Sequence, residues 1–153
     1  MSNTVSITGD SIVKLGGRIF TDFSIGEIAK ISFPNDSWVV KPGKNGNTIY
    51  VFKADGRVAD FAMRLILGSG DDKWMNNQFS LAENNPAGVA LLQGEFTINN
   101  GDGNGGITPV TYVLSGGVIL KRPEAMENTD GSEQQSEAVW TMKFGKAPRV
   151  IGG

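Results

Sequence analysis

The chain has 153 residues and contains neither cysteine nor histidine, which excludes disulfides, thiol chemistry and the Ser-His-Asp and Cys-His catalytic arrangements. Fourteen basic and sixteen acidic side chains give a formal charge of −2, which argues against tight binding to a nucleic-acid backbone. Twenty-one glycines favour a β-dominated domain with many turns. We therefore expect one mainly β domain over residues 1–153, with no catalytic, cofactor or metal site.

The pattern of the N-terminal third predicts short strands. Apolar residues between Val5 and Leu15 predict one or two strands that end at Gly16-Gly17, and Arg18–Phe23 is the next candidate. In the strand expected at 27–33, Ala29 and Ile31 lie on the side that faces a core. The segment from Pro34 to Asn47 ends in KPGKNGN and is interpreted as an exposed loop.

The stretch from Thr48 to Asn77 is predicted to be the folding nucleus. Thr48–Lys53 and Val58–Leu67 are apolar and alternating, and Ala54-Asp55-Gly56 between them predicts a β-hairpin. Ser69 then supplies an N-cap, and Asp71 and Asp72 suit the positive end of a helix dipole. Helical spacing predicts a short helix that packs against the sheet through Trp74, Phe79 and Leu81.

The second half predicts three more strands. Val89–Asn99 places Leu92, Phe96 and Ile98 on one face and becomes polar on the other. Val110–Leu120 is interrupted by Ser115-Gly116-Gly117, which predicts a bend or bulge, and Ala138–Phe144 alternates as a final strand.

The connections in this half carry polar and glycine residues. The glycines at 101–106 have a dinucleotide-fingerprint spacing, but a strand pattern follows them and a helix does not. Asp102 and Asn104 offer too few ligands for calcium, so a hairpin tip is favoured. The acidic segment 123–137 is interpreted as a solvated loop, and the tail GKAPRVIGG is too short to fold alone.

The order of elements resembles the tail tube proteins of contractile-tailed bacteriophages, which are related to the tube protein of type VI secretion. The segments DFAMRLILGSGDDKWMNN (60–77) and GVALLQGEFTINN (88–100) carry the resemblance, which covers most of residues 12–146. It implies a β-sandwich or open barrel with one short flanking α-helix and extended loops and termini. Flexible ends are expected at about 1–10 and 146–153.

The resemblance also implies a function. Six subunits would join strand edges into a ring, and rings would stack into a tube whose lumen conducts DNA during ejection. The implied partners are other copies of the chain and the tail sheath, baseplate and tail terminator proteins. The implied location is the virion tail, assembled in the host cytoplasm. No apolar run approaches the roughly 20 residues of a membrane span, so no membrane is expected.

Residues can be assigned to these roles on the same basis. If Asp60–Ile66 and Val89–Asn99 are inner strands, the residues opposite the core would give the lumen a slightly acidic lining; they are Asp60, Ala62, Arg64, Gln93, Glu95 and Thr97. Stacking or subunit contacts would come from loops and termini; the candidates are Asp36, Lys41, Lys44, Asn45, Asp55 and Arg149.

A second class of function stays open. A monomeric β-sandwich that binds a glycan or a partner protein would need a cluster of exposed aromatic side chains. Only Trp38 and Tyr50 are near one another in sequence, whereas Trp74 and Trp140 fall in patterns that predict core positions.

Overall fold

The computed structural model describes residues 6–24, 26–125, 127, 129–130 and 136–152. The elements of this part are β1 (Ser6–Leu15), β2 (Arg18–Phe20), β3 (Ala29–Ser32), β4 (Trp38–Pro42), η1 (Lys44–Gly46), β5 (Thr48–Phe52), η2 (Ala54–Arg57), β6 (Ala59–Ile66), α1 (Gly70–Asn84), η3 (Pro86–Gly88), β7 (Leu92–Gly101), β8 (Ile107–Lys121), β9 (Glu137–Lys146) and β10 (Arg149–Ile151).

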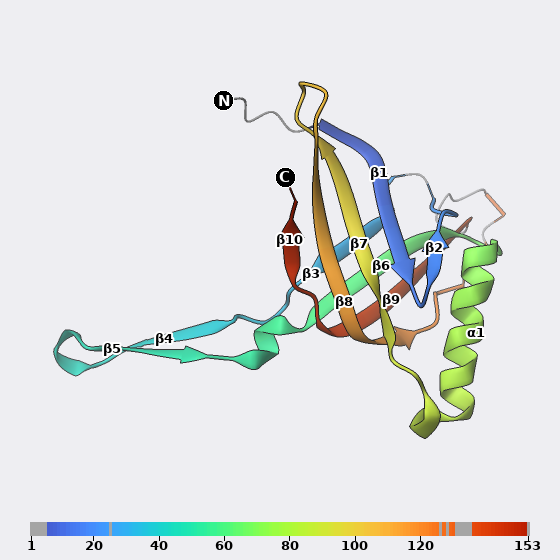
Figure 1. The fold of residues 1–153 in the computed structure, drawn as a ribbon. Helices are drawn as coiled ribbons and strands as arrows, with labels where there is room; N and C mark the ends of the chain where they lie inside the picture. Colours follow the sequence, from blue (N-terminus) through green and yellow to red (C-terminus); the bar gives the residue numbers. More distant parts are fainter. Residues whose placement is uncertain (1–5, 25, 126, 128, 131–135, 153) are drawn as a thin grey trace.

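Eight strands form one antiparallel sheet in the order β2-β1-β7-β8-β9-β6-β3, with β10 added to β8. The sheet folds over to make two layers (Figure 1). We call β1, β7, β8 and β10 the terminal layer and β3, β6 and β9 the opposing layer. Phe61 of β6 and Phe96 of β7 are on strands that are not neighbours, yet their ring centroids lie 5.3 Å apart. The core therefore lies between the two layers.

Strand β8 belongs to both layers. Between the pairs Gly94–Leu114 and Leu92–Gly117, two steps along β7 match three steps along β8, so β8 carries one extra residue. Gly116 takes a positive φ of 67° there. A side chain at Gly117 would collide with the ring of Phe144. Beyond this bulge β8 pairs with β9, and the bend predicted from Ser115-Gly116-Gly117 is confirmed.

A short extended segment bridges the layers on the other side. After β2 the chain reaches β6, where Phe23 pairs with Leu65 and the Ser24 N–H donates to the Arg64 carbonyl at 3.0 Å. β3 then pairs with the earlier part of β6. The result is an open barrel with one helix, so the predicted fold class is confirmed.

The core follows the alternation of the strands. In β6 the buried positions are Ala59, Phe61, Met63 and Leu65, and in β9 they are Ala138, Trp140, Met142 and Phe144. In β3, Ala29 and Ile31 pack against this core, as predicted. Strands β6 and β9 therefore bury every second side chain and turn the rest outward.

Helix α1 covers the edge of the barrel near β2 and β9 (Figure 1). Ser69 is its N-cap, as predicted, and accepts from the Asp72 N–H at 3.3 Å. Asp71 is 1% exposed and does more than favour the helix dipole. It accepts from Arg18 Nε at 2.9 Å and from the Thr21 and Asp22 N–H groups at 2.8 Å each. One carboxylate thus joins the helix to β2.

The predicted hairpin over Thr48–Leu67 is wrong. β5 pairs with β4 through Trp38–Phe52 to Pro42–Thr48, whereas β6 pairs with β3 and β9. Asn45 and Gly46 both take positive φ (67° and 83°), which is the backbone of a tight hairpin turn. The predicted loop 34–47 is therefore partly strand, and Ala54–Arg57 only redirects the chain.

Three smaller expectations also differ from the structure. The strand predicted to begin at Val89 begins at Leu92, because Pro86–Gly88 forms a 3-10 turn. The tail does not stay apart, since Arg149–Ile151 pairs with β8. Leu81 is 63% exposed and does not pack the helix, whereas Met75 is fully buried. Much of the acidic loop, including Glu133, lies outside the described residues.

The helix contacts predict a matched pair of stability changes. Trp74 packs edge-on against Phe20, with ring centroids 5.5 Å apart, so Trp74→Ala is expected to lower the free energy of unfolding by about 2–4 kcal/mol. Leu81→Ala removes an exposed side chain and is expected to cost less than about 0.5 kcal/mol. Urea titration of both variants checks this; equal losses would contradict the packing described.

Candidate assembly surfaces

The residues predicted to line a lumen lie on two opposite faces. Asp60 and Arg64 point outward from β6 in the opposing layer, and Gln93, Glu95 and Thr97 point outward from β7 in the terminal layer. Since Phe61 and Phe96 meet in the core between these strands, the two sets point away from each other. One bore can therefore be lined by only one of the two sets.

The outward face of the terminal layer is mostly uncharged. Across the strands, Ile12, Thr97, Thr111 and Val150 form one row, in which the two threonine hydroxyls lie 3.2 Å apart. Glu95 lies opposite Lys14 of β1. The slight acidity expected from Glu95 is therefore balanced by a lysine on the neighbouring strand.

The outward face of the opposing layer carries paired charges. Arg64 Nη1 lies 3.0 Å from Glu137 Oε2, and Lys143 Nζ lies 3.6 Å from Asp60 Oδ1. Lys30 and Lys121 share this face, because their cross-strand partners are Ala62 and Thr141. This face has more basic than acidic side chains on the described strands, contrary to the slightly acidic set expected from sequence.

The β4–β5 hairpin, which we call the arm, projects away from the barrel (Figure 1). Among the strands that the structure describes, these two pair only with each other. One face of the arm holds Trp38, Val40, Tyr50 and Phe52, which are 57, 55, 67 and 47% exposed. An isolated two-stranded hairpin is marginal in water. The arm thus offers an uncovered apolar surface.

Hydrogen bonds and close backbone packing fix the base of the arm. The Lys53 N–H donates to the Ser37 carbonyl at 2.7 Å, and Asn35 Nδ2 donates to the Asp55 carbonyl at 3.3 Å. A Cβ on Gly56 would lie 2.6 Å from Ser37 Cα, so only glycine fits at this position. The arm is therefore anchored at a defined point of the barrel.

The stacking candidates are partly brought together. Lys41, Lys44 and Asn45 lie on the outer part of the arm, and Asp36 and Asp55 lie at its base. Arg149 is separate from them, on β10.

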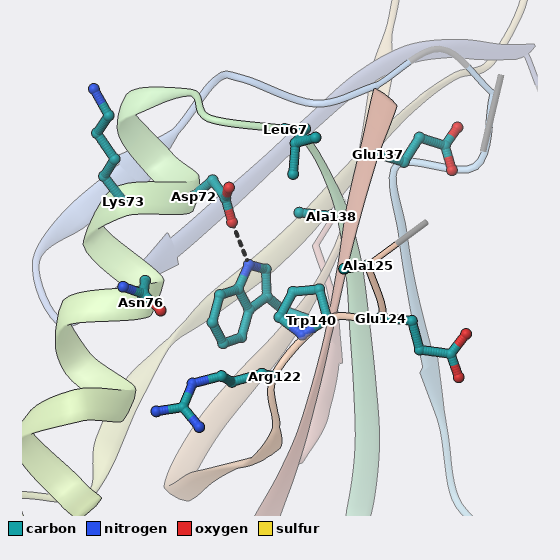
Figure 2. A pocket seen from close by; sticks show the side chains of 11 residues that line it. Leu67, Asp72, Lys73, Asn76, Arg122, Glu124, Ala125, Glu137, Ala138 and Trp140 are labelled. Carbon is teal, nitrogen blue, oxygen red and sulfur yellow. Dashed lines mark hydrogen bonds between the residues drawn. The ribbon is translucent and has the colours of Figure 1, made fainter. Parts of the chain in front are cut away.

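A cleft of about 350 Å³ lies between α1, β9 and residues 122–125 (Figure 2). Trp140 forms one wall and donates from Nε1 to Asp72 Oδ1 at 2.8 Å. In Figure 2, Lys73 points to the upper left, whereas Glu124 and Glu137 both point to the right, away from the Trp140 ring. Arg122 is held by an ion pair with Glu83 and by the Phe79 ring. The cleft thus lacks the convergent polar groups that an active site needs.

Two solved structures share this architecture. The chain is similar to one from the sheath/tube terminator of an extracellular contractile injection system, PVC, in the extended state (TM-score 0.54, 12% identity, 94% of this chain and 93% of that one). It is equally similar to a chain of the PVC sheath-tube complex in the extended state (TM-score 0.54, 10% identity, 94% and 88% covered). The chain therefore shares the fold of these two chains.

Other comparisons are weaker or negative. Hcp1 from Flavobacterium johnsoniae aligns with a TM-score of 0.41 at 14% identity, with 94% of each chain covered. No protein-family model and no curated protein matches the sequence. Across the described ranges, no helix is long and apolar enough to cross a membrane. The same residues contain no cluster of carboxylates suited to a metal.

Two features of the structure, the arm and β10, are not predicted by the sequence pattern. The sequence pattern predicts a loop at 34–47 and pairs the strand Thr48–Lys53 with Val58–Leu67, although Asn45-Gly46 between two apolar runs is a strong hairpin signal. β10 was missed because a three-residue strand carries no periodic pattern of its own. In contrast, Trp38 and Tyr50 were singled out as neighbouring aromatics, and the structure places both on one face of the arm.

The β7–β8 tip supports the hairpin interpretation of the glycine-rich segment. Asp102 Oδ1 accepts from the Asn104 N–H at 2.7 Å and from the Gly106 N–H at 3.0 Å. These two donors, Asn104 first, lower the pKa of Asp102 below its ordinary value.

A pH dependence of the tip follows from this lowered pKa. The ionised carboxylate holds the tip above the unfolded pKa of about 3.9, and the contacts are lost as pH falls through the folded pKa. Amide NMR signals of Asn104 and Gly106 are expected to stay constant from about pH 7 to 5 and to shift only below about 4. Asp102→Asn removes the carboxyl that titrates and should abolish that shift; a midpoint above about 4 in the unmodified protein would contradict the assignment.

Proposed function

We propose that this protein is a structural tube subunit of a contractile injection apparatus, without an active site. Copies form hexameric rings, and the rings stack into a tube. The observation that carries this proposal is the β4–β5 arm, an apolar hairpin that the described residues leave uncovered, on a fold shared with chains of a contractile injection system.

The arm is the stacking device in this proposal. Trp38, Tyr50 and Phe52 present apolar area that gains free energy when a neighbouring ring covers it, at about 25 cal/mol per Å². Lys41 and Lys44 near the tip add charge that orients the contact. Asp36 and Asp55 at the base and Arg149 on β10 are proposed as further subunit contacts.

The remaining roles concern cargo and partners. We propose that the lumen conducts DNA without sequence-specific binding, in the tail of a virion assembled in the host cytoplasm. The Lys14–Glu95 pair on the terminal layer fits such passage, because a face without clustered lysine or arginine does not hold phosphates. Sheath, baseplate and terminator proteins are the proposed partners; chains of the sheath-tube and sheath/tube terminator complexes share the fold.

One observation favours a second function, a monomeric binding module. Trp38 and Phe52 pack edge-on on the arm with ring centroids 5.2 Å apart, and Tyr50 lies on the same face. Exposed aromatic side chains of this kind also bind sugars or partner proteins. Reproducible binding of a monomer on a glycan array, removed by Trp38→Ala, would favour this alternative.

Ring formation is the first test of the tube function. Sedimentation velocity and negative-stain microscopy of the concentrated protein are expected to show rings or tubes about 80–100 Å across, the size of a barrel of about 24 strands at about 4.8 Å spacing plus an outer layer. A protein that stays monomeric at every concentration would refute the proposal.

Arm variants separate stacking from ring formation. Trp38→Glu with Tyr50→Glu places charges on the apolar face of the arm and is expected to leave rings intact while reducing tube length at least tenfold. The matched control is Ile49→Glu with Val51→Glu on the other face of the arm. Both double variants should keep the melting temperature of the barrel, since the arm strands pair only with each other. Long tubes from the Trp38/Tyr50 variant would remove the arm from stacking.

A further inference from the structure

We propose that the terminal layer is the sheet that continues from copy to copy, through pairing of the β10 edge of one copy with the β1 edge of the next. Its outward face then lines the bore. This inference rests on the proposed tube function. It names the seam, which is the joint between β10 of one copy and β1 of the next, and the bore face, which is the face of the sheet that lines the lumen.

The two layers differ in their free borders. The terminal layer ends on one side at β10 and on the other at the stretch 6–12 of β1, since β2 pairs only with Val13–Leu15. The opposing layer has β3 at one border, but its other border, β9, is already paired with β8. A ring needs two different complementary borders on each copy. On the described strands, only the terminal layer has both.

The backbone of β10 has hydrogen-bonding groups on its outer side that no described strand pairs with. The Pro148 carbonyl accepts from the Val113 N–H at 3.0 Å, and the Gly152 N–H donates to the Pro109 carbonyl at 2.9 Å. Residues alternate in an antiparallel ladder, so Val150 also bonds toward β8 while Arg149 and Ile151 bond outward. An edge of this kind is a template for another strand.

The strand directions allow antiparallel pairing between β10 of one copy and β1 of the next. β1, β7, β8 and β10 are each antiparallel to the next, so β10 runs opposite to β1. A rotation about an axis along the strands brings the β1 edge of a second copy beside β10 without reversing it. The new pair is therefore antiparallel, and the sheet continues with the same alternation as within one copy.

Exposed apolar side chains mark both borders. Ile7 and Ile12 on β1 are 87 and 46% exposed, and Val150 and Ile151 on β10 are 53 and 57% exposed. Ile12 and Val150 are the two ends of the row that crosses the layer through Thr97 and Thr111. Joining the borders covers these four side chains, which a lone copy leaves in water.

Circumference decides which layer is inside. Four terminal-layer strands in each of six copies make a barrel of about 115 Å circumference and about 18 Å radius at about 4.8 Å spacing. A second layer packs about 10 Å away, so inside that barrel it would have about 50 Å of circumference. The opposing layer needs about 85 Å for three strands in each copy. The opposing layer must therefore lie outside the terminal layer.

The bore face follows from this order of layers. Gln93, Glu95 and Thr97 point into the bore, together with Lys14 and Thr111 from the neighbouring strands. Asp60 and Arg64 point to the outside of the tube, where their ion pairs with Lys143 and Glu137 lie.

The seam can be tested with engineered disulfides, because the chain has no cysteine of its own. Cysteine is placed at Ile7, Ser11 or Ile12 and, in the same chain, at Val150 or Ile151. Within one copy Ile12 and Val150 are three strand spacings apart, about 14 Å, too far for a disulfide. On oxidation of assembled particles, at least one pair is expected to give a covalent ladder that ends at the ring size.

The controls distinguish a wrong seam from a wrong function. Single-cysteine variants are expected to give no ladder. The pair Ser32→Cys with Val150→Cys joins the β3 border to β10 and is also expected to give no ladder. Rings in which no β1–β10 pair forms a ladder, or in which the β3 control does, would overturn the seam while the tube function stands. A chain that never assembles refutes the tube function itself.

A backbone variant tests the same edge without cysteine. Ile151→Pro removes an N–H that points away from β8 and is expected to raise the concentration needed for ring formation at least tenfold with an unchanged melting temperature. Ile151→Ala keeps that N–H and is expected to assemble within threefold of the unmodified chain. Equal assembly of the two variants would contradict pairing through β10.

Labelling of assembled tubes tests the bore face. Glu95→Cys and Lys143→Cys are expected to react alike with a small maleimide, but only Lys143→Cys with a polymer maleimide too large for the bore. In the monomer both should react with both reagents, since both positions face outward. The reverse pattern in tubes would place the opposing layer inside.

Discussion

The extra residue in β8 is the constraint on which the rest of the architecture depends. At Ser115-Gly116 the strand bends, and the missing side chain of Gly117 lets the ring of Phe144 pack directly on its backbone. One strand thereby serves both layers. The layers are joined at that border, so among the described strands the opposing layer has one unpaired edge, β3, while the terminal layer has two, β10 and the 6–12 stretch of β1. The bulge thus decides which sheet can continue into another copy.

Because the sheet folds into two layers, the chain has two outward faces that differ in charge. The terminal face is a surface of threonine, glutamine and valine with one lysine opposite one glutamate. The opposing face carries cross-strand ion pairs whose side chains are partly exposed. Such exposed pairs contribute about 0–1 kcal/mol each, so they add little to stability.

Most of the barrel could be predicted from the sequence because its strands are long and alternate strictly. In β6 and β9 every second residue is apolar, which determines the side that faces the core. Ser115-Gly116-Gly117 predicts the bulge. The helix start at Ser69 is equally local, since a hydroxyl and two carboxylates suffice to mark it. Local signals of this kind survive in any tertiary context.

What failed depended on pairing between distant segments. β5 is adjacent to β6 in sequence, yet their hairpin gave way to the tighter Asn45-Gly46 turn, which pairs β5 with β4. Leu81 has the helical spacing of a core residue but lies on the exposed side of α1, although Phe79 before it packs on the core and Glu83 after it pairs with Arg122. The division of the lumen candidates could not be foreseen either. Alternation assigns a side to each residue within a strand but does not relate the sides of strands that pair elsewhere.

The arm has little burial of its own to stabilise it. Its strands bury little on either face, and an isolated two-stranded hairpin is marginal in water. Its base is nevertheless fixed, since Gly56 lies against Ser37 and a backbone hydrogen bond closes the hairpin at Lys53. A hairpin with a fixed base and an uncovered apolar face has lost part of its conformational entropy before it meets a partner. Docking therefore costs less than ordering a disordered loop would, and more of the apolar burial appears as affinity.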